Sequence, residues 1–196
     1  MKKVVLTTFT LLAITLSSQA QTQKDWYLIG GSVSDLGIDF QENNTAFSFN
    51  LTPRIAWFIK DNFALGAEAL IGLNTSRGFT SVSYGIGPIA RYYMTSRAIP
   101  TIRKTRWFLD ANVGFNGTNV KVNENPGVST NGLGIGFGPG LAYFINQNIA
   151  LEVVPKYNLT VGFGNSTTTH SINMNIGFQI FLPKAKLKSM KDDVNQ

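Results

Sequence analysis

The chain has 196 residues, enough for one domain or one closed barrel, and only 14% of them are charged, against about 25% in typical soluble domains. So few charges cannot easily cover a solvent-facing surface, and the absence of cysteine excludes a disulfide framework and a thiolate metal site. The formal net charge of +6 comes mostly from lysines near the two ends of the chain, which argues against nucleic acid as a partner.

Residues 1–20 have the form of a secretory signal peptide. "MKK" is a positive n-region, "VVLTTFTLLAITL" is an apolar h-region, and "SSQA" ends on a small residue. This pattern predicts export by a Sec-type route with cleavage after Ala20. No later stretch has the roughly 20 unbroken apolar residues that a membrane helix needs. The mature chain is therefore predicted to be exported and to contain no helical membrane span.

Apolar and polar residues then alternate along most of the chain, which is the period of a β-strand. The strands are predicted at 26–34, 45–59, 63–74, 79–94, 106–118, 131–145, 149–162 and 170–182. Globular strands are typically about five or six residues long, whereas about nine to eleven tilted residues cross a bilayer. The predicted lengths match the second case.

The joints between these strands are of two kinds. Short turns are predicted at 60–62 and 146–148, and a longer basic joint at 95–105. Polar joints rich in Asn, Gly, Ser and Thr are predicted as loops near 35–44, 74–79, 118–130 and 163–169. The alternation indicates a barrel domain over 21–183. The charged tail over 184–196 is expected to be disordered and to lie in the periplasm with the other end of the mature chain.

The polar face of the strands decides between a soluble barrel and a membrane barrel. It consists mostly of Gly, Ala, Ser, Asn and Thr, and its charges are three basic and three acidic: Arg54, Glu68, Arg91, Asp110, Glu152 and Lys156. A secreted soluble barrel that binds an apolar ligand, which remains the alternative, would present many more Lys and Glu residues to water. The pattern favours a polar lumen and an apolar wall in lipid, where a sheet must close because every backbone group needs a partner.

The inward charges are expected to pair, because a buried ion without a partner is costly. Glycine on one strand is expected to make room for a long side chain on the next. Arg91 has two candidate partners on adjoining strands, Glu68 and Asp110. Glu152 and Lys156 share one strand face and therefore need partners across the lumen or on neighbouring strands.

A repeated stretch locates one rim of the wall. "PRIAWFIKDNFAL" at 53–65 and "PGLAYFINQNIAL" at 139–151 each describe a strand, a tight turn and the next strand. Outward aromatic residues at this level form a predicted girdle at the headgroup boundary. Its members are Trp57, Phe63, Tyr92, Trp107 and Tyr143. Pro53, Pro88, Pro139 and Pro155 lie within strands, where each removes a ladder donor, and local bulges are expected there.

Two motifs that hint at other chemistry are better explained by strand packing and by a loop. "GLGIGFGPG" at 132–140 places glycine at every second residue and does not match a nucleotide-binding loop. His170 beside Ser171 could indicate a barrel enzyme that modifies lipid, but such an enzyme needs a positioned base, nucleophile and orienting carboxylate. A loop position is the favoured interpretation. No catalytic, cofactor-binding or metal-binding residue is predicted.

The signal peptide, the short "KDNFALG" turn, the Gly-Pro-aromatic strands and the closing strand "NIGFQIFL" resemble one known family over residues 26–182. This is the small outer-membrane β-barrel family, OmpA- and OmpX-like, in the porin-family form of Bacteroidetes-type bacteria. The resemblance implies an all-β, eight-stranded, antiparallel, up-and-down transmembrane barrel in the cell outer membrane of a Gram-negative bacterium. The implied partners are outer-membrane lipid, lipopolysaccharide and, during insertion, the barrel assembly machinery.

The function expected from these observations is structural or concerned with surface interaction, without catalysis or a cofactor. At about eight strands, side chains fill the interior of a barrel, so a lumen plugged by charged and polar groups is predicted. A narrow pore for ions or small solutes is the alternative, a lipid-modifying barrel enzyme is the third hypothesis, and the soluble binder is the fourth.

Overall fold

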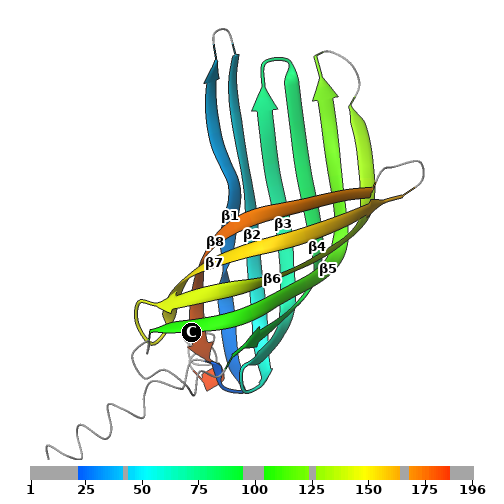
Figure 1. Ribbon diagram of the computed structural model, residues 1–196. Coiled ribbons are helices and arrows are strands. Elements are labelled where there is room, and N and C mark those ends of the chain that lie inside the picture. Colours follow the sequence, from blue (N-terminus) through cyan, green and yellow to red (C-terminus); the bar gives the residue numbers. More distant parts are fainter. Residues whose placement is uncertain (1–21, 42–43, 95–103, 124–126, 164–167, 186–196) are drawn as a thin grey trace, which may run out of the picture.

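The structure is a computed structural model that describes residues 22–41, 44–94, 104–123, 127–163 and 168–185. These residues form one closed antiparallel barrel in which each strand pairs with its neighbours in sequence and β1 pairs with β8 (Figure 1). The strands are β1 (Trp26–Gln41), β2 (Asn44–Lys60), β3 (Phe63–Ser76), β4 (Phe79–Tyr93), β5 (Thr105–Val122), β6 (Val128–Phe144), β7 (Ile149–Gly162) and β8 (Thr168–Pro183). The predicted fold class is confirmed. The predicted signal peptide and most of the predicted tail lie outside the described residues.

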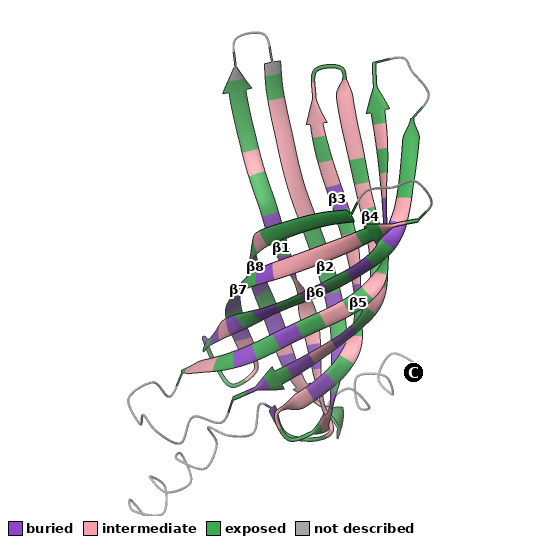
Figure 2. Cartoon of the chain, turned by 45° about the vertical axis from the view of Figure 1, so that its right-hand side comes forward, coloured by how far each residue is buried: buried purple, intermediate pink, exposed green. Residues whose placement is uncertain are grey.

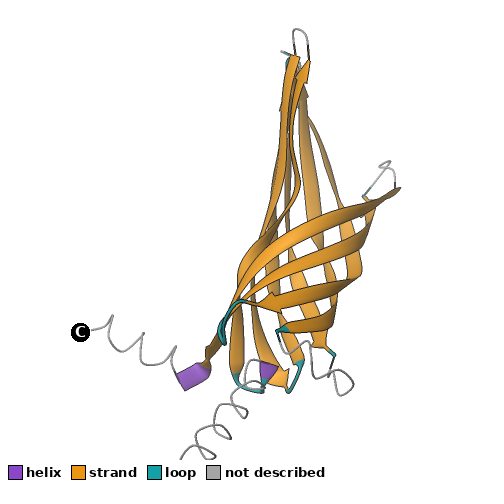
Figure 3. Cartoon of the chain, turned by 60° about the vertical axis from the view of Figure 1, so that its left-hand side comes forward, coloured by secondary structure: helices purple, strands orange, loops and turns teal. Residues whose placement is uncertain are grey.

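The two ends of the barrel differ. One end, here called the turn end, carries the tight β2–β3 and β6–β7 joints, and both ends of the described chain lie there (Figure 3). The Lys184 amide donates to the Asp25 carbonyl oxygen across 3.0 Å, which ties these two ends of the chain together. The opposite end, here called the loop end, carries the β1–β2, β3–β4, β5–β6 and β7–β8 joints. Among the described residues, no helix has the length and apolar character to cross a membrane.

Several strands extend further toward the loop end than the sequence predicted. The expected loops near 35–44 and 118–130 are mostly strand, because β1 continues to Gln41 and β5 and β6 reach Val122 and Val128. In β1 the register shifts between Ser34 and Gly37, and this shift hides the continuing alternation. As a result, the β1–β2, β3–β4 and β5–β6 hairpins rise above the β7–β8 hairpin (Figure 1).

The bulges expected at the in-strand prolines are not present in the described ladders. At Pro53, Pro88, Pro139 and Pro155 the register continues unchanged on both sides. Instead, one of the two ladders at each proline lacks a short run of paired residues and then resumes in the same register, as between Ile86–Phe115 and Ile89–Asn112. The sequence-based expectation was wrong because a missing donor interrupts a ladder without requiring an extra residue.

Burial alternates along the strands as the sequence pattern predicts, so buried and exposed residues follow one another along each strand (Figure 2). In β6 the inward residues from Gly132 to Phe144 are mostly buried, and outward residues such as Ile135 and Phe137 are exposed. Glycine makes this packing possible at Gly140, because a side-chain carbon there would collide with the Phe108 ring. An exposed wall of large apolar side chains around a narrow interior suits a barrel that is solvated by lipid.

The lipid-facing wall generates the first testable prediction. Ile135→Arg places a charge on the outer face, at a position 43% exposed and paired with Val113. We expect a loss of about 2–4 kcal/mol in the free energy of unfolding, measured by denaturant titration in lipid vesicles, because a cation near the bilayer midplane is costly. Leu151→Arg, beside Tyr143 at the turn end, should cost less.

Ile135→Leu is the matched control and should unfold at the wild-type denaturant concentration. Equal stability of Ile135→Arg and Ile135→Leu would mean that this face does not lie in lipid.

Candidate functional site in the barrel lumen

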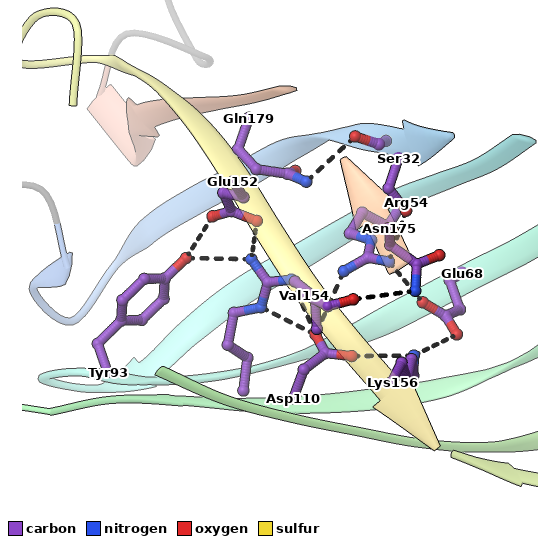
Figure 4. Close-up of polar contacts among 12 residues, drawn as sticks. Ser32, Arg54, Glu68, Tyr93, Asp110, Glu152, Val154, Lys156, Asn175 and Gln179 are labelled. Carbon is purple, nitrogen blue, oxygen red and sulfur yellow. Dashed lines mark hydrogen bonds and ion pairs between the residues drawn. The ribbon is translucent and has the colours of Figure 1, made fainter. Parts of the chain in front are cut away.

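The six charges of the polar face meet inside the barrel (Figure 4). Five strands supply them, and each side chain is buried, with residue exposures of 1–9%: Arg54 from β2, Glu68 from β3, Arg91 from β4, Asp110 from β5, and Glu152 and Lys156 from β7. Ion pairs connect all of them into one network, which is called the lumen network below. Its formal charge is zero.

Arg91 is the centre of the half of the network nearer the turn end. Its Nη2 lies 2.8 Å from Asp110 Oδ2, and its Nη1 lies 2.6 Å from Glu152 Oε2. Arg91 Nε donates to the same Asp110 oxygen across 3.0 Å. The guanidinium carbon also lies 4.1 Å from the centre of the Phe108 ring, in cation–π range. Because Glu152 comes from β7, this arginine spans the lumen from β4.

The expected contact between Arg91 and Glu68 is not among the ion pairs of the described residues. The β3–β4 register places Ala64, not Glu68, opposite Arg91. Glu68 instead lies opposite Gly87, closer to the loop end. The sequence showed that Glu68 and Arg91 share a face, but the offset between neighbouring strands, which decides which residues meet, is set by the ladder.

Arg54 and Lys156 hold the half of the network nearer the loop end. Arg54 Nη2 lies 3.2 Å from Glu68 Oε2, and Arg54 Nη1 lies 3.2 Å from Asp110 Oδ2. Lys156 Nζ lies 2.9 Å from Asp110 Oδ1 and 3.4 Å from Glu68 Oε1. Asp110 therefore contacts all three cations and joins the two halves.

Glycine on the adjoining strands makes room for these long side chains. Four of the six network residues have glycine as a register partner: Arg54 with Gly30, Glu68 with Gly87, Asp110 with Gly138 and Glu152 with Gly177. A Cβ at Gly30, Gly87 or Gly138 would collide with the backbone of a neighbouring strand, and a Cβ at Gly136 would lie 2.9 Å from Lys156 Cε. The abundance of glycine is thus tied to the lumen network.

An aromatic layer lies on the turn-end side of the lumen network. Tyr93 connects the two, because its hydroxyl donates to Glu152 Oε1 across 3.1 Å and accepts from Arg91 Nη1 across 3.2 Å. The Tyr93 ring packs against Phe58, Phe108 and Phe181 with ring-centre distances of 5.2–6.1 Å. Phe144 extends the layer through Phe181 at 5.1 Å. These side chains are buried, and together they are called the aromatic plug.

Strand alternation places Phe58, Tyr93 and Phe144 on the inward face, but the sequence did not predict that they meet in an aromatic plug. Its members alternate with the outward aromatic residues, so the signal was a pair of adjacent aromatic residues near the turn end, as in Tyr92–Tyr93 and Trp107–Phe108. The outward member of such a pair faces the wall, and the inward member faces the lumen.

The residues assigned to the girdle lie on the outer wall near the turn end. Trp57, Tyr92, Trp107 and Tyr143 are exposed, and Phe63 is half-buried. Tyr27 was not assigned to the girdle, yet it stacks on Trp57 with ring centres 6.3 Å apart. Lys184 Nζ lies 5.8 Å from the centre of the Trp57 ring. Aromatic rings beside a lysine suit the boundary between hydrocarbon and headgroups.

His170 and Ser171 do not face each other as a base and a nucleophile. His170 Nδ1 shares a hydrogen bond of 2.6 Å with the Tyr157 hydroxyl, whereas the Ser171 hydroxyl donates to Asn173 Oδ1 across 3.1 Å. All these contacts lie at exposed or half-buried positions on β7 and β8. The described residues contain no group of three or more His, Cys, Asp or Glu side chains that could hold a metal ion.

Comparison with known proteins agrees with this geometry. Residues 7–180 match the family model of the outer membrane protein β-barrel domain. The fold is similar to Neisserial surface protein A, with a TM-score of 0.58 and 14% identity over 82% of this chain and 97% of that one. It is also similar to the N-terminal β-barrel domain of Pseudomonas aeruginosa OprF, with a TM-score of 0.55 and 12% identity over 81% and 98% of the two chains. No curated protein sequence matches.

The lumen network generates the second prediction. Arg91→Ala removes the cation that holds Asp110 and Glu152, which leaves two buried carboxylates short of a partner. We expect a loss of about 3–5 kcal/mol in the free energy of unfolding, measured by denaturant titration in vesicles.

Lys121→Ala is the control, because Lys121 is an exposed cation on β5 beyond the network. Its effect should stay within about 0.5 kcal/mol. A small effect of Arg91→Ala, similar to that of Lys121→Ala, would mean that water reaches the network and solvates its ions.

Proposed function

The chain belongs to the outer membrane protein β-barrel domain family, and we propose that it is a non-enzymatic integral protein of the cell outer membrane with a plugged lumen. Its role is to hold the projecting hairpins of the loop end at the cell surface for interaction. The observation that carries this proposal is the combination of the lumen network and the aromatic plug, which occupy successive levels of one narrow lumen.

The contacts across the lumen support a closed barrel. The Arg91–Glu152 ion pair joins β4 to β7, and the Lys156–Glu68 pair joins β7 to β3. Below them, buried aromatic rings from β2, β4, β5, β6 and β8 form the aromatic plug. An eight-stranded barrel is just wide enough for side chains to fill, so two filled levels in series leave little room for a continuous water path.

The projecting part of β1 supports a role in surface interaction. The described β1–β8 ladder ends at Val33–Ile176, so from Ser34 to Gln41 the only described strand partner of β1 is β2. This stretch exposes Leu36, Ile38 and Phe40 at 72%, 56% and 81%. A strand edge with exposed apolar side chains is a site where another chain can add a strand.

The proposed orientation places the turn end in the periplasm and the loop end outside the cell. A chain exported with a signal peptide inserts from the periplasm, and both described ends of this chain lie at the turn end. The wall would contact outer-membrane lipid and lipopolysaccharide, and insertion would use the barrel assembly machinery.

A narrow pore is the second candidate, and one observation favours it. A polar cavity of about 490 Å³ occupies the loop-end half of the barrel and reaches Arg54, Glu68 and Lys156. A pore would require the cavity to continue past the aromatic plug.

Ion conductance separates the plug from the pore. Purified wild-type protein in planar bilayers should show little or no conductance, because the lumen network and the aromatic plug block the same path. A double variant, Tyr93→Ala with Phe181→Ala, removes two rings of the aromatic plug and should conduct more than the wild type. Heat-modifiable gel migration checks that each sample is folded. Steady single-channel conductance from the folded wild type would favour the pore.

Surface accessibility tests the orientation. An epitope tag inserted between Val122 and Val128, at the loop end, should be labelled by antibody on intact cells. The same tag between Asn146 and Asn148, at the turn end, should be labelled only after the outer membrane is permeabilised. The reverse pattern would invert the orientation.

A further inference from the structure

The loop-end half of the barrel contains a cavity that lies outside the levels closed by the lumen network and the aromatic plug. It has a volume of about 490 Å³, within the range of roughly 300–1,000 Å³ for small-molecule sites. Its deepest residues belong to the lumen network: Arg54, Glu68 and Lys156. Arg91 and Glu152 do not line it, because they lie nearer the aromatic plug. The cavity, called the vestibule below, is therefore closed at its base.

The lining of the vestibule is polar and electrically balanced. It contains seven asparagines, and only Leu70 and Ile86 are large and apolar. Its charged residues are two basic, Arg54 and Lys156, and two acidic, Asp35 and Glu68. An apolar ligand would find almost no apolar surface here. A charged ligand of either sign would be attracted by two of the wall charges and repelled by the other two.

The side-chain amides form a connected set of donors and acceptors. Asn50 Nδ2 donates to Asp35 Oδ2 across 2.6 Å, and Asn173 Nδ2 lies 2.9 Å and 3.0 Å from the two Asp35 oxygens. Asn158 and Ser171 each donate to Asn173 Oδ1 across 3.1 Å. This set joins β1, β2, β7 and β8. Neighbouring amides fixed by such contacts present donors and acceptors in set directions.

Deeper in the vestibule, two buried polar atoms have neither a hydrogen bond nor an ion pair among the described residues. They are Asn112 Oδ1, which is an acceptor, and Arg54 Nε, which is a donor. Both residues line the cavity, and Arg54 is only 7% exposed. Both atoms are covered by neighbouring groups, so they add to the polarity beneath the lining and are not themselves ligand contacts.

From this lining we propose that the vestibule is a binding site for a neutral, polyhydroxylated ligand, such as an oligosaccharide end. Each sugar hydroxyl both donates and accepts, as the amide and hydroxyl groups of the wall require. The balanced charges favour a neutral ligand over an acidic or basic one. Because the base is closed, the ligand binds and leaves through the loop end, so the site serves recognition rather than passage. This binding site is separate from the proposed interaction at the β1 edge, and sugar binding in the vestibule does not depend on that interaction.

The test is direct binding of sugars to the purified full chain in an amine-oxide detergent, which carries no sugar itself. Saturation-transfer NMR and titration calorimetry are run with lactose and with N,N′-diacetylchitobiose as probes. We expect saturation transfer to at least one of these neutral disaccharides. Adding a carboxylate to the probe, as in 3′-sialyllactose, should not tighten binding relative to lactose.

A matched pair of variants locates the site. Thr118 lines the vestibule, and its neighbour Asn119 is exposed on the other face of β5. Thr118→Trp fills the cavity and should weaken binding about tenfold or more, which corresponds to about 1.4 kcal/mol, whereas Asn119→Trp should leave binding unchanged. Asn158→Leu, which removes one amide from the lining, should also weaken binding. Heat-modifiable gel migration confirms that the variants are folded.

Three results would overturn the proposal. The first is no binding of either neutral disaccharide to folded wild type at millimolar concentration. The second is full binding to Thr118→Trp, which would place any sugar site outside the vestibule. The third is much tighter binding of 3′-sialyllactose than of lactose, which would assign the cavity to anions. None of these readouts depends on conductance or orientation, so the plugged-barrel proposal can fail independently.

Discussion

The ladder between β1 and β8 closes the sheet, and the rest of the structure depends on this closure. Along this ladder Trp26 to Val33 pair with Pro183 to Ile176, which removes both strand edges from the part of the barrel beside the girdle. A bilayer offers no water to unpaired backbone groups, so only a closed sheet is stable there. Closure also fixes the interior width, and at eight strands side chains can close the lumen at the levels of the lumen network and the aromatic plug.

The narrow interior explains why charges lie in the lumen as a balanced network. Removing an ion from water is costly, and the cost is recovered only when partners and hydrogen bonds are well placed. Asp110 meets this condition by contacting Arg54, Arg91 and Lys156. Glycine provides the space, as at Gly136, where a Cβ would crowd the Lys156 side chain. The inward charges and the high glycine content are thus related, because both belong to the packing of the same narrow lumen.

Much of this arrangement follows from period and composition alone. The number of strands, their faces, the inward charges and the outward apolar wall are local properties, because each depends on whether a residue is at an odd or even place in its strand. The pairing of Arg91 with Glu152 was not predictable in the same way. It depends on the register of β4 and β7 and on the curvature that brings them face to face, and neither leaves a local signal.

The difference between local pattern and strand pairing also explains which sequence-based predictions were wrong. The prolines were expected to cause bulges, but the ladders at Pro88 and Pro139 lack a few pairs and keep their register, which only the paired strand reveals. The loop assigned near 35–44 is mostly strand because a single irregularity at Asp35 resets the alternation. The aromatic plug escaped prediction because strand alternation shows that Phe58, Tyr93 and Phe144 point inward but not that they meet in one layer, which depends on strand register.

Asp35 marks the place where the closed barrel becomes an open sheet. Its φ of 54° is uncommon for a residue other than glycine, and the β1 register shifts immediately after it. Beyond this point the described β1 residues no longer pair with β8, yet the Asp35 carboxylate still accepts from Asn173 on β8. Where the β1–β8 backbone ladder stops, the Asp35 side chain thus keeps a contact between the two strands. The same carboxylate contributes an acceptor to the wall of the vestibule. One residue therefore combines the positive φ beside the register shift in β1 with a polar group that the cavity wall uses.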